Sequence, residues 1–401
     1  MTILYIHQYF KTPKEPGGTR SYWISKALIA KGHKVVMICS TNKNHPISGI
    51  EIIDGIEVHY VKNDYSNYMS PLAKVKSFVS FLQKSIKEAT KQKNVDLVFA
   101  TSTPLTVGGV ALALKRMKHW SYVFEVRDLW PEFPIQIGAI KNPLLIKALK
   151  VFEKKIYKHS NHIVALSPGM KEGVINTGIP EEKVSMVPNM SKPDEFFPHE
   201  PNTEIAKKFG IDSGKFNIIH FGSMGVANGL EYIIDTAKLC ADQGLADVEF
   251  IFMGDGATQP KLKQKTEEFG LKNVRFLGNH PMKIVSEVVN LCDVSITSFK
   301  NLPILQTNSP NKLFDSLSAG KPIVVNSAGW TKDLVEKENC GFYVDPDNPQ
   351  DFVDHIRKYK NNKEKLKEWG GNARRLSEIT YDKAILSNQV ADIIEKATIP
   401  I

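Results

Sequence analysis

The chain has 401 residues and a mass of 45.0 kDa, which is too long for a single ordinary core and predicts two domains. An apolar fraction of 42% with 24% charged residues excludes a disordered chain. Four scattered cysteines, with no CxxC or Cys/His cluster, argue against a disulfide framework or a structural zinc site and favour a reducing cytoplasm. The N-terminus, MTILYIHQYF, lacks the basic leader of a signal peptide, so we expect it to form the first strand.

Short β-prone runs alternate with longer helical patterns along the chain, which is typical of the α/β class with parallel sheets. Residues 186–204 contain four prolines and no sustained periodicity, and they predict the domain boundary. We expect an N-terminal domain over 1–200, a C-terminal domain over 201–380, and a helix over 381–401 that packs back on the N-terminal domain. Each domain has enough strands for one doubly wound sheet. The expected strands are 2–7, 34–38, 56–61, 96–100, 121–126, 162–166, 184–187, 217–222, 248–253, 273–276, 293–297, 322–325 and 341–344.

Positive charge is concentrated in the first half of the chain. Residues 1–200 contain 27 Lys and Arg against 17 Asp and Glu, whereas residues 201–401 contain 25 against 26. This asymmetry indicates an anionic partner for the first half, either a nucleic acid or a membrane surface. Nucleic acid is the weaker candidate, because lysine dominates over arginine and no nucleic-acid-binding signature is present.

Two amphipathic runs, residues 71–93 and 142–160, place apolar side chains at helical spacing among lysines, and KRMKHW at 115–120 adds basic and aromatic residues. They fit an interfacial helix face that meets anionic lipid. An ordinary amphipathic helix packed on a sheet, with its lysines in water, has the same pattern. The uncharged stretch Leu97–Leu114 contains several polar residues, one proline and two glycines, so we interpret it as a strand, a turn and a buried helix and not as a membrane span.

Three glycine- or proline-marked turns precede predicted helices. In HFGSMGVANGLEYI (220–233), a strand runs into a glycine-rich turn whose backbone N–H groups can approach an oxyanion, although a plain strand-to-helix turn has the same sequence. In TNSPNKLFDSLSAGKPIVV (307–325), Pro310 suits the first helical position, with Asn308 or Ser309 as the cap. In the third, Arg20 lies in the first turn of a helix after Gly17 and Gly18, where a base opposes the macrodipole.

In this order, these elements resemble the retaining glycosyltransferases of family 4, which have two Rossmann-like domains that face a cleft, the GT-B fold. The resemblance covers nearly the whole chain and includes VALSPGMKEGVI (164–175), VSMVPNM (184–190), FMGDGATQPKL (252–262) and VRFLGNHP (274–281). The phrase VRDLWPE is similar to the branch that adds amino or deoxyamino sugars, such as N-acetylfucosamine, to lipid-linked intermediates of O-antigen and capsule synthesis.

The resemblance implies a UDP-sugar donor site in the second half, with the base near Gly278–Pro281 and the ribose on Asp315. The diphosphate would lie between Gly17–Gly18 and the loop 222–225. The implied donor-binding residues are Gly17, Gly18, Gly222, Ser223, Met224, Gly225, Asn279, Asn308, Ser309, Lys312 and Asp315.

The chain departs from the family pattern at two places. The first member of the family's glutamate pair falls on Thr307, and the second on Asp315. The loop 222–229 also lacks the Arg and Lys that many relatives use to bind the diphosphate. We expect Lys312 to supply that charge, with Arg127 or Arg20 supplementary.

The segment FEVRDLWPEF (124–133) ends a predicted buried strand in charged residues, at the place where ligands gather in open α/β sheets. Many family members have a His-Asp pair near this point, and here the pair is Arg127 and Asp128. Asp128 would orient or deprotonate the acceptor hydroxyl, and Arg127 would steady the leaving phosphate. An Arg127 ion pair with Asp128 or Glu132 that only pins the loop is the structural alternative. The implied acceptor-binding residues are Arg20, Trp130, Glu132 and His7.

We expect neither a metal nor a cofactor, because the one DxD motif, Asp345–Asp347, is explained by a turn and a helix start. The sequence thus predicts a cytoplasmic, membrane-associated retaining glycosyltransferase with a UDP-activated amino sugar as donor. The acceptor would be an undecaprenyl-diphosphate-linked saccharide at the inner face of the cytoplasmic membrane, with no nucleic acid as partner. A UDP-N-acetylglucosamine 2-epimerase on the same fold and a non-catalytic sugar-nucleotide- or membrane-binding protein are the alternatives.

Overall fold

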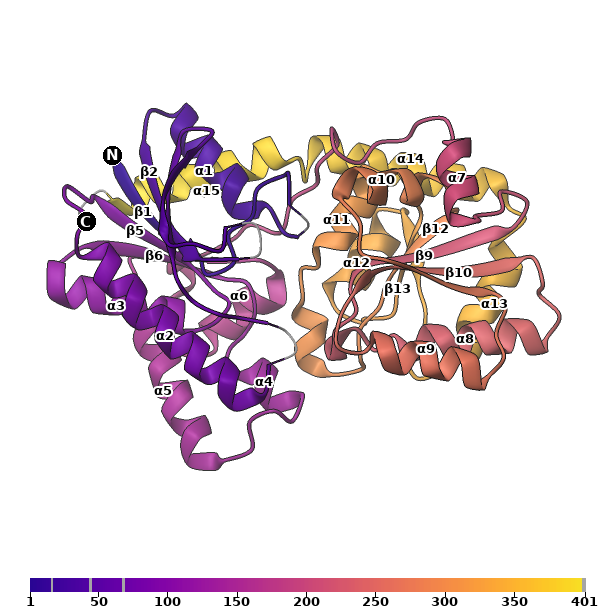
Figure 1. Ribbon diagram of the computed structural model, residues 1–401, viewed down its shortest axis with the longest axis horizontal. Coiled ribbons are helices and arrows are strands. Elements are labelled where there is room, and N and C mark those ends of the chain that lie inside the picture. The colour runs from indigo at the N-terminus through magenta and orange to yellow at the C-terminus, as the bar shows by residue number, and fades with distance from the viewer. Residues whose placement is uncertain (16, 43–44, 67–68, 399–401) are drawn as a thin grey trace. The chain divides into compact units, whose positions relative to one another are not determined.

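The computed structural model describes residues 1–15, 17–42, 45–66 and 69–398, and Pro16 of the first glycine turn lies outside them (Figure 1). The chain divides into two compact units, each with its own sheet. Unit 1 comprises residues 1–12, 19–188 and 383–401, and unit 2 comprises residues 13–18 and 189–382. The division between Pro188 and Asn189 lies inside the predicted boundary region 186–204 and twelve residues before residue 200. The C-terminal segment from Lys383 groups with unit 1.

Unit 1 contains an eight-stranded sheet of order β3-β4-β2-β1-β5-β6-β7-β8. Every pairing in it is parallel except that between β3 and β4, which form an antiparallel hairpin at one edge. The central strands are buried on both faces, as expected for a parallel sheet covered by helices. The strands are β1 (Thr2–Ile6), β2 (Lys34–Ser40), β3 (Gly49–Ile53), β4 (Ile56–Val61), β5 (Leu97–Thr101), β6 (Ser121–Val126), β7 (His162–Ala165) and β8 (Val184–Met186).

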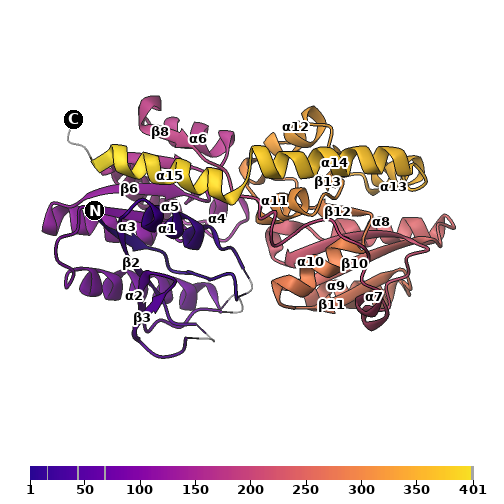
Figure 2. The same cartoon turned by 90° about the horizontal axis from the view of Figure 1, so that it is seen from above.

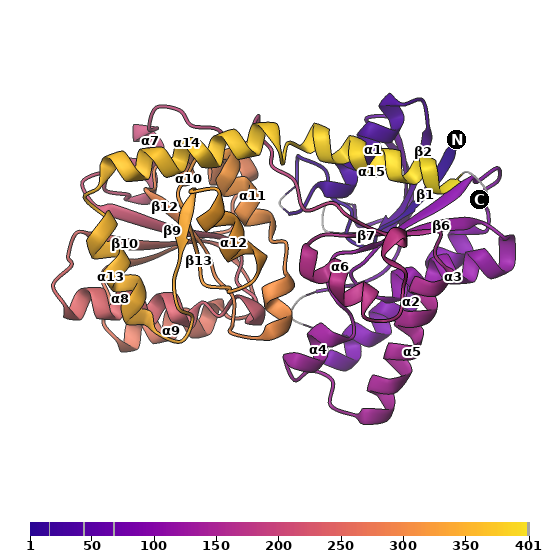
Figure 3. The same cartoon turned by 180° about the vertical axis from the view of Figure 1, so that it is seen from behind.

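Helices cover both faces of this sheet (Figures 1 and 3). One face carries α2, α3 and α5, and the other carries α1 with α15, the C-terminal helix that runs beside it in all three views (Figure 2). The ammonium group of Lys31, the C-cap residue of α1, forms ion pairs with Asp392 and Glu395 of α15. The helices are α1 (Arg20–Ala30), α2 (Pro71–Ala89), α3 (Thr106–Lys118), α4 (Glu132–Gln136), α5 (Pro143–His159), α6 (Pro168–Ile175), η1 (Glu181–Lys183) and α15 (Lys383–Thr398).

Unit 2 contains a six-stranded, all-parallel sheet of order β11-β10-β9-β12-β13-β14. Separate apolar clusters lie on its two faces, one with α8, α9 and α13 and the other with α10 and α11. The strands are β9 (Phe216–Ser223), β10 (Val248–Asp255), β11 (Val274–Gly278), β12 (Val294–Thr297), β13 (Ile323–Val325) and β14 (Gly341–Tyr343). The helices are α7 (Thr203–Phe209), η2 (Val226–Asn228), α8 (Glu231–Asp242), α9 (Gln259–Glu268), α10 (Met282–Asn290), η3 (Pro303–Thr307), α11 (Asn311–Ser318), α12 (Trp330–Lys337), α13 (Pro349–Tyr359) and α14 (Lys363–Ile379).

Capping residues explain where several helices begin. The side chains of Ser70, Asn142 and Ser167 accept hydrogen bonds from the first-turn N–H groups of α2, α5 and α6, and each is followed by proline at the first helical position. The expected cap of α11 is wrong. This helix begins at Asn311 after Pro310 without a side-chain cap, because the Ser309 hydroxyl accepts from the Asn189 N–H instead.

The predicted α/β class with two doubly wound sheets is confirmed, and each predicted strand is present. One further strand, β3, was not predicted, and it pairs with β4 through a turn in which Asp54 and Gly55 both have positive φ. Within the described residues, none of the helices has the length and apolar character that crossing a bilayer requires.

Candidate functional site

A cavity of about 460 Å³ opens at the carboxyl edge of the unit 2 sheet. Chain order reverses there, because β9 is followed by β10 on one side and is paired with β12 on the other. Such switch points are where open α/β sheets bind ligands. The cavity is lined by Gly17, Gly18, Phe221, Gly222, Ser223, Asn228, Met253, Gly254, Asp255, Asn279, His280, Met282, Val285, Phe299, Pro310, Asn311, Lys312 and Asp315, all of which belong to unit 2.

Two glycines at neighbouring strand ends keep this cavity open. Gly222 and Gly254 are paired residues of β9 and β10, and both have positive φ, of 101° and 141°. A Cβ on Gly254 would lie 1.9 Å from the Gly222 carbonyl oxygen, so a side chain there would have to displace the adjacent strand. The backbone at the mouth of the cavity is therefore bare, as close approach to a phosphate requires.

Lys312, in the first turn of α11, is the cationic residue of this cavity. Its Nζ lies 3.3 Å from Nε2 of His220, a buried residue of β9. Burial lowers the pKa of Lys312 to about 7, and burial together with the Lys312 charge holds the pKa of His220 well below its usual range. In the described part of the chain, no carboxylate lies within ion-pairing distance of Lys312. A bound diphosphate would supply the missing negative charge.

Asp315 lines the same cavity one helical turn further along α11. Its carboxylate pairs with the Lys192 ammonium at 2.9 Å, and both side chains are buried. Burial raises the pKa of Asp315, and the Lys192 charge offsets part of that rise. Burial also opposes the charge on Lys192, but the charges of Asp315 and Glu195 outweigh it, so the pKa of Lys192 is raised. Lys192 thus favours the ionised form of a carboxylate in the cavity, whose oxygens can accept hydrogen bonds from a diol.

Seven of the eleven predicted donor-binding residues line the cavity, and four do not. Met224 is fully buried in the core, and its carbonyl oxygen accepts from Thr258. Ser309 is engaged with Asn189, and the Asn308 carbonyl accepts from the Trp330 indole. Gly225 is the N-cap residue of η2 and also lies outside the lining. His280, which lies in the segment Gly278–Pro281 predicted to contact the base, also lines the cavity. Asn228, Gly254 and Asp255 line it as well and were not predicted as site residues.

At the carboxyl edge of the unit 1 sheet, functional groups follow three neighbouring strands, β1, β5 and β6. His7 follows β1, with one ring nitrogen 2.8 Å from the Ser21 hydroxyl and the other 3.3 Å from an Arg127 nitrogen. Burial, and then the Arg127 charge, hold the pKa of His7 well below its usual range, so the ring is neutral near pH 7. The structure therefore brings His7 and Arg127, two predicted site residues, into contact.

Asp128 lies beside this group, and its carboxylate accepts from the Thr103 hydroxyl at 3.3 Å. Burial raises the pKa of Asp128 to about 6, against the lowering effects of Arg127 and Thr103. In the described part of the chain, Arg127 has no carboxylate within 4 Å, so the alternative of a loop-pinning ion pair with Asp128 or Glu132 is wrong. A half-buried carboxylate with a pKa near 6 suits a general base at neutral pH.

Four aromatic rings form a continuous row beside these residues. The row runs from Trp130 to Phe78, Tyr65 and Tyr9, with ring centroids 6.4, 5.7 and 4.9 Å apart. All four side chains are partly exposed. Rings of this kind present apolar faces on which sugars and hydrocarbon chains pack. The row therefore offers an apolar track that leads away from Asp128.

Two predicted acceptor residues have structural partners. Arg20 is buried, and its guanidinium pairs with Glu125 at 2.8 Å and donates to the carbonyls of Val187 and Pro188. Its nitrogens are thus engaged within unit 1, and we do not retain it as an acceptor or phosphate contact. Glu132 accepts from Gln136 and pairs with Lys150 at 3.3 Å, and its pKa is lowered chiefly by the Gln136 hydrogen bond.

The amphipathic helices α2 and α5 leave apolar side chains in solvent. Leu72 is 66% exposed on α2, and Leu144 is 78% exposed on α5. Lysines accompany them on both helices. The exposed apolar side chains of these helices are Leu72, Val75, Val79, Leu144, Leu145 and Val151.

The Asp345–Asp347 motif forms a turn, as its sequence indicates. The Asp345 carboxylate accepts from the Asp347 N–H, and the Asp351 carboxylate accepts from the Asp345 N–H. Within the described residues, no three His, Cys, Asp or Glu side chains are grouped as metal ligands. Independence from metal ions and cofactors stays a prediction.

Comparison with known families assigns the two halves separately. Residues 17–190 match the family described as Glycosyl transferase 4-like domain, and residues 201–376 match the family described as Glycosyl transferases group 1. WbjE of Pseudomonas aeruginosa, described as a probable glycosyltransferase, is 21% identical over 268 residues, which are 66% of this chain and 66% of WbjE. TuaH of Bacillus subtilis, named for teichuronic acid biosynthesis, is 27% identical over 270 residues, which are 65% of each chain. The matches span just under two thirds of both relatives.

The fold has close counterparts among solved structures. HepE from Anabaena, crystallised in complex with UDP and glucose, is 19% identical to this chain. The alignment covers 98% of this chain and 99% of HepE, with a TM-score of 0.73. This likeness confirms the predicted GT-B fold.

Proposed function

We propose that this chain, which belongs to the group 1 glycosyltransferases with the GT-B fold, transfers an amino or deoxyamino sugar from UDP to an undecaprenyl-diphosphate-linked saccharide. N-acetyl-L-fucosamine is the donor sugar that the VRDLWPE segment favours. The observation that carries the proposal is that Lys312 and Asp315 both line a cavity with several glycines at the switch point of the unit 2 sheet. The product would enter O-antigen or capsule synthesis, and TuaH, a relative named for teichuronic acid biosynthesis, supports that class of pathway.

Unit 2 would hold the donor. The Lys312 ammonium would neutralise the diphosphate over the bare backbone of Gly222 and Gly254, and Asp315 would accept hydrogen bonds from the ribose diol. The preference for UDP rests on the resemblance and is supported by HepE, whose crystals contain UDP. A tighter affinity for GDP than for UDP would contradict this assignment.

Unit 1 would hold the acceptor. In the proposed reaction the acceptor hydroxyl oxygen bonds to the anomeric carbon of the donor, and the bond from that carbon to the diphosphate breaks, which releases UDP. Asp128 would receive the proton of the hydroxyl, since its pKa of about 6 keeps it largely ionised above neutral pH. Arg127, which has a neutral His7 as its neighbour, would stabilise the departing phosphate. Trp130 and Glu132 would contact the acceptor sugar.

The inner face of the cytoplasmic membrane would supply the acceptor. The exposed apolar side chains of α2 and α5, together with their lysines, fit peripheral attachment to anionic lipid. The aromatic row from Trp130 to Tyr9 would accommodate the acceptor near Asp128.

The test is product formation from defined substrates. The full chain is incubated with UDP-N-acetyl-L-fucosamine, UDP-N-acetylglucosamine or GDP-fucose and with a synthetic undecaprenyl-diphosphate-linked saccharide, and products are identified by mass spectrometry. UDP release that requires the lipid-linked acceptor, with one added aminosugar in the product, supports the proposal. Conversion of the UDP-sugar without acceptor would favour an epimerase, and binding without turnover would favour a non-catalytic protein.

A further inference from the structure

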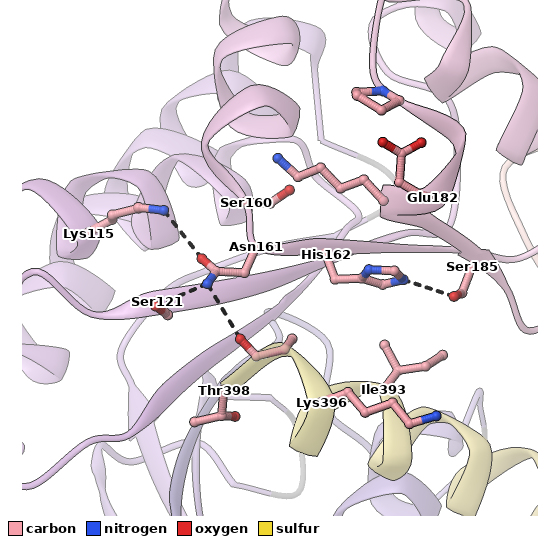
Figure 4. Close-up of a pocket in the computed structure, with 13 residues that line it drawn as sticks. Lys115, Ser121, Ser160, Asn161, His162, Glu182, Ser185, Ile393, Lys396 and Thr398 are labelled. Atoms are coloured by element: carbon pink, nitrogen blue, oxygen red, sulfur yellow. Dashed lines mark hydrogen bonds between the residues drawn. The ribbon is translucent and has the colours of Figure 1, made fainter. Parts of the chain in front are cut away.

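A second cavity, of about 730 Å³, lies in unit 1 at the amino-terminal edge of the sheet, the edge opposite Asp128 (Figure 4). Ser121 and His162 begin β6 and β7 there, and the last turns of α15 form another wall. The volume is that of a small-molecule site, which is typically about 300–1,000 Å³. The lining includes Lys115, Asn161, His162, Glu182, Lys183 and Lys396.

Positive charge dominates this lining. Lys115, Lys183 and Lys396 contribute three ammonium groups, whereas Glu182 is the one acidic side chain among the described lining residues. In the part of the chain that the structure describes, no carboxylate lies within 4 Å of any of the three ammonium groups. The three ammonium groups therefore form no ion pair within the described protein, and an anion is the chemistry that would pair with them.

Two of the lysines are held in place but not saturated. Lys115 donates to the His159 carbonyl at 2.7 Å and to the Asn161 side-chain oxygen at 3.3 Å, and Lys183 donates to the Lys158 carbonyl at 2.9 Å. These carbonyls end α5, so both lysines also cap that helix. An ammonium has three protons, and among the described residues the remaining three protons of this pair have no protein acceptor.

The polar side chains between the lysines are fixed by hydrogen bonds. Asn161 donates to the Ser121 hydroxyl at 3.2 Å, and His162 lies 2.8 Å from the Ser185 hydroxyl (Figure 4). Burial lowers the pKa of Lys115. Burial and the neighbouring Lys115 charge lower the pKa of Lys183, and burial and the Lys183 charge lower the pKa of His162. The basic groups thus repel one another in a preorganised, partly desolvated cavity.

We propose that this cavity binds a phosphate-bearing small molecule between the ammonium groups of Lys115, Lys183 and Lys396. Phosphate fits better than carboxylate, because the charge comes from three separate lysines. Among the described lining residues no arginine is present to form the planar two-point contact that a carboxylate prefers. A group with two negative charges and several oxygens matches this array. The site is separate from both proposed substrate sites, since it lies at the other edge of the unit 1 sheet.

Inorganic pyrophosphate is the probe for calorimetry on the full chain. Saturating UDP is present to occupy the unit 2 cavity, and the Lys312→Gln chain, in which that cavity has lost its cation, serves as a second background. Sodium chloride keeps the ionic strength constant. We expect one pyrophosphate per chain in both backgrounds, at least a tenfold loss of affinity in Lys183→Gln, and recovery of most of the affinity in Lys183→Arg.

Lys118→Gln is the matched control, because Lys118 lies on α3 with Lys115 but outside the lining, and it should leave the affinity unchanged. Lys183→Gln removes a hydrogen bond at the end of α5 and can destabilise that terminus. Lys396→Gln therefore serves as a second test variant, and it should weaken pyrophosphate binding severalfold. No pyrophosphate binding, or equal affinities in Lys183→Gln, Lys396→Gln and Lys118→Gln, would overturn the proposal. Lys183-dependent binding to phosphatidate vesicles without pyrophosphate binding would also overturn it, because the ligand would then be a lipid headgroup.

Discussion

The carboxyl edge of unit 2 presents bare backbone, whereas the carboxyl edge of unit 1 presents side chains. In unit 2, Gly222 and Gly254 place backbone without side chains in the cavity lining, and among the described lining residues Lys312 is the cation. In unit 1, His7, Arg127 and Asp128 meet beside a row of aromatic rings. Backbone recognition suits a diphosphate, which UDP- and GDP-sugars share, and side-chain recognition suits a specific acceptor. Substitutions in unit 2 should therefore affect donor binding, and substitutions in unit 1 should affect turnover and acceptor use.

The largest effect should follow from removing the bare backbone. Gly254→Ala places a Cβ 1.9 Å from the Gly222 carbonyl oxygen, so β9 and β10 must separate at the cavity. We expect a loss of about 3 kcal/mol or more in the free energy of unfolding and no measurable UDP binding. Urea unfolding followed by circular dichroism measures the first quantity. Gly244→Ala is the control, because its φ is 74° but no atom lies within 4 Å, and it should cost about 1 kcal/mol.

The next largest effect should be on turnover. Asp128→Asn removes the proposed base, and we expect the turnover number to fall about 10²–10⁴-fold while UDP affinity is retained. The pH profile sharpens this prediction. Asp128 must be ionised to take a proton, so turnover in the unchanged chain should fall as the pH decreases through about 6, and Asp128→Asn should lose that step. Unchanged turnover in Asp128→Asn would place the base elsewhere.

Donor affinity should depend on Lys312 by a smaller factor. Lys312→Ala should weaken UDP binding about 10–100-fold, as expected for the loss of one charge-assisted contact in a desolvated site. Lys321→Ala is the control, since Lys321 is half-buried like Lys312 but donates to the Asn290 carbonyl outside the donor cavity. Calorimetric titration measures both variants. Equal losses would contradict the role of Lys312.

The Lys312 charge also predicts how donor affinity varies with pH. The protonated ammonium binds the diphosphate, and the pKa of about 7 belongs to the ligand-free chain. Affinity for UDP-glucose, whose diphosphate does not titrate in this range, should be nearly constant from pH 6 to 6.5. It should then fall towards a tenfold loss per pH unit as the pH rises above 7. A flat profile to pH 8.5 would show that Lys312 stays charged throughout or does not contact the donor.

The smallest expected effect concerns the aromatic row. Trp130→Ala should raise the Michaelis constant for a lipid-linked acceptor several-fold, because it removes one apolar face from the track, while the constant for the donor is unchanged. Steady-state kinetics with each substrate varied separately measure both constants. A rise in the Michaelis constant for the donor alone would contradict a contact between Trp130 and the acceptor.

Local signals in the sequence were sufficient for thirteen of the strands, for the helical runs that begin near Pro71 and Pro143, and for the glycine turn at Gly222. The strand β3 was missed because Ile50 and Ile52 are exposed there, although Asp54–Gly55 between two apolar runs is a hairpin signal. Gly254 and Asp255 could also have been predicted, since the strand at 248–253 runs directly into Gly-Asp-Gly. Asn228 could have been predicted because it lies in the glycine turn after the strand that ends at Gly222.

Long-range pairing was not predictable from local patterns. Arg20 finds its partner Glu125 at a distance of 105 residues along the chain, and Lys192 finds Asp315 in the same way. Arg20 therefore looked like a free base at a helix start, and Asp315 like an unpaired ribose ligand. The pKa values of Asp128 and Lys312 likewise depend on burial. Burial results from packing within each unit and cannot be predicted from the residues that are adjacent in sequence.

The most direct test of the central claim is a paired measurement on Asp128→Asn and Lys312→Ala with a UDP-aminosugar and a synthetic undecaprenyl-diphosphate-linked acceptor. Acceptor-dependent UDP release gives turnover, and calorimetry gives UDP affinity. We predict that Asp128→Asn loses turnover with affinity retained, and that Lys312→Ala loses affinity. Absence of acceptor-dependent UDP release in the unchanged chain, or the same pattern of loss in both variants, would contradict the account.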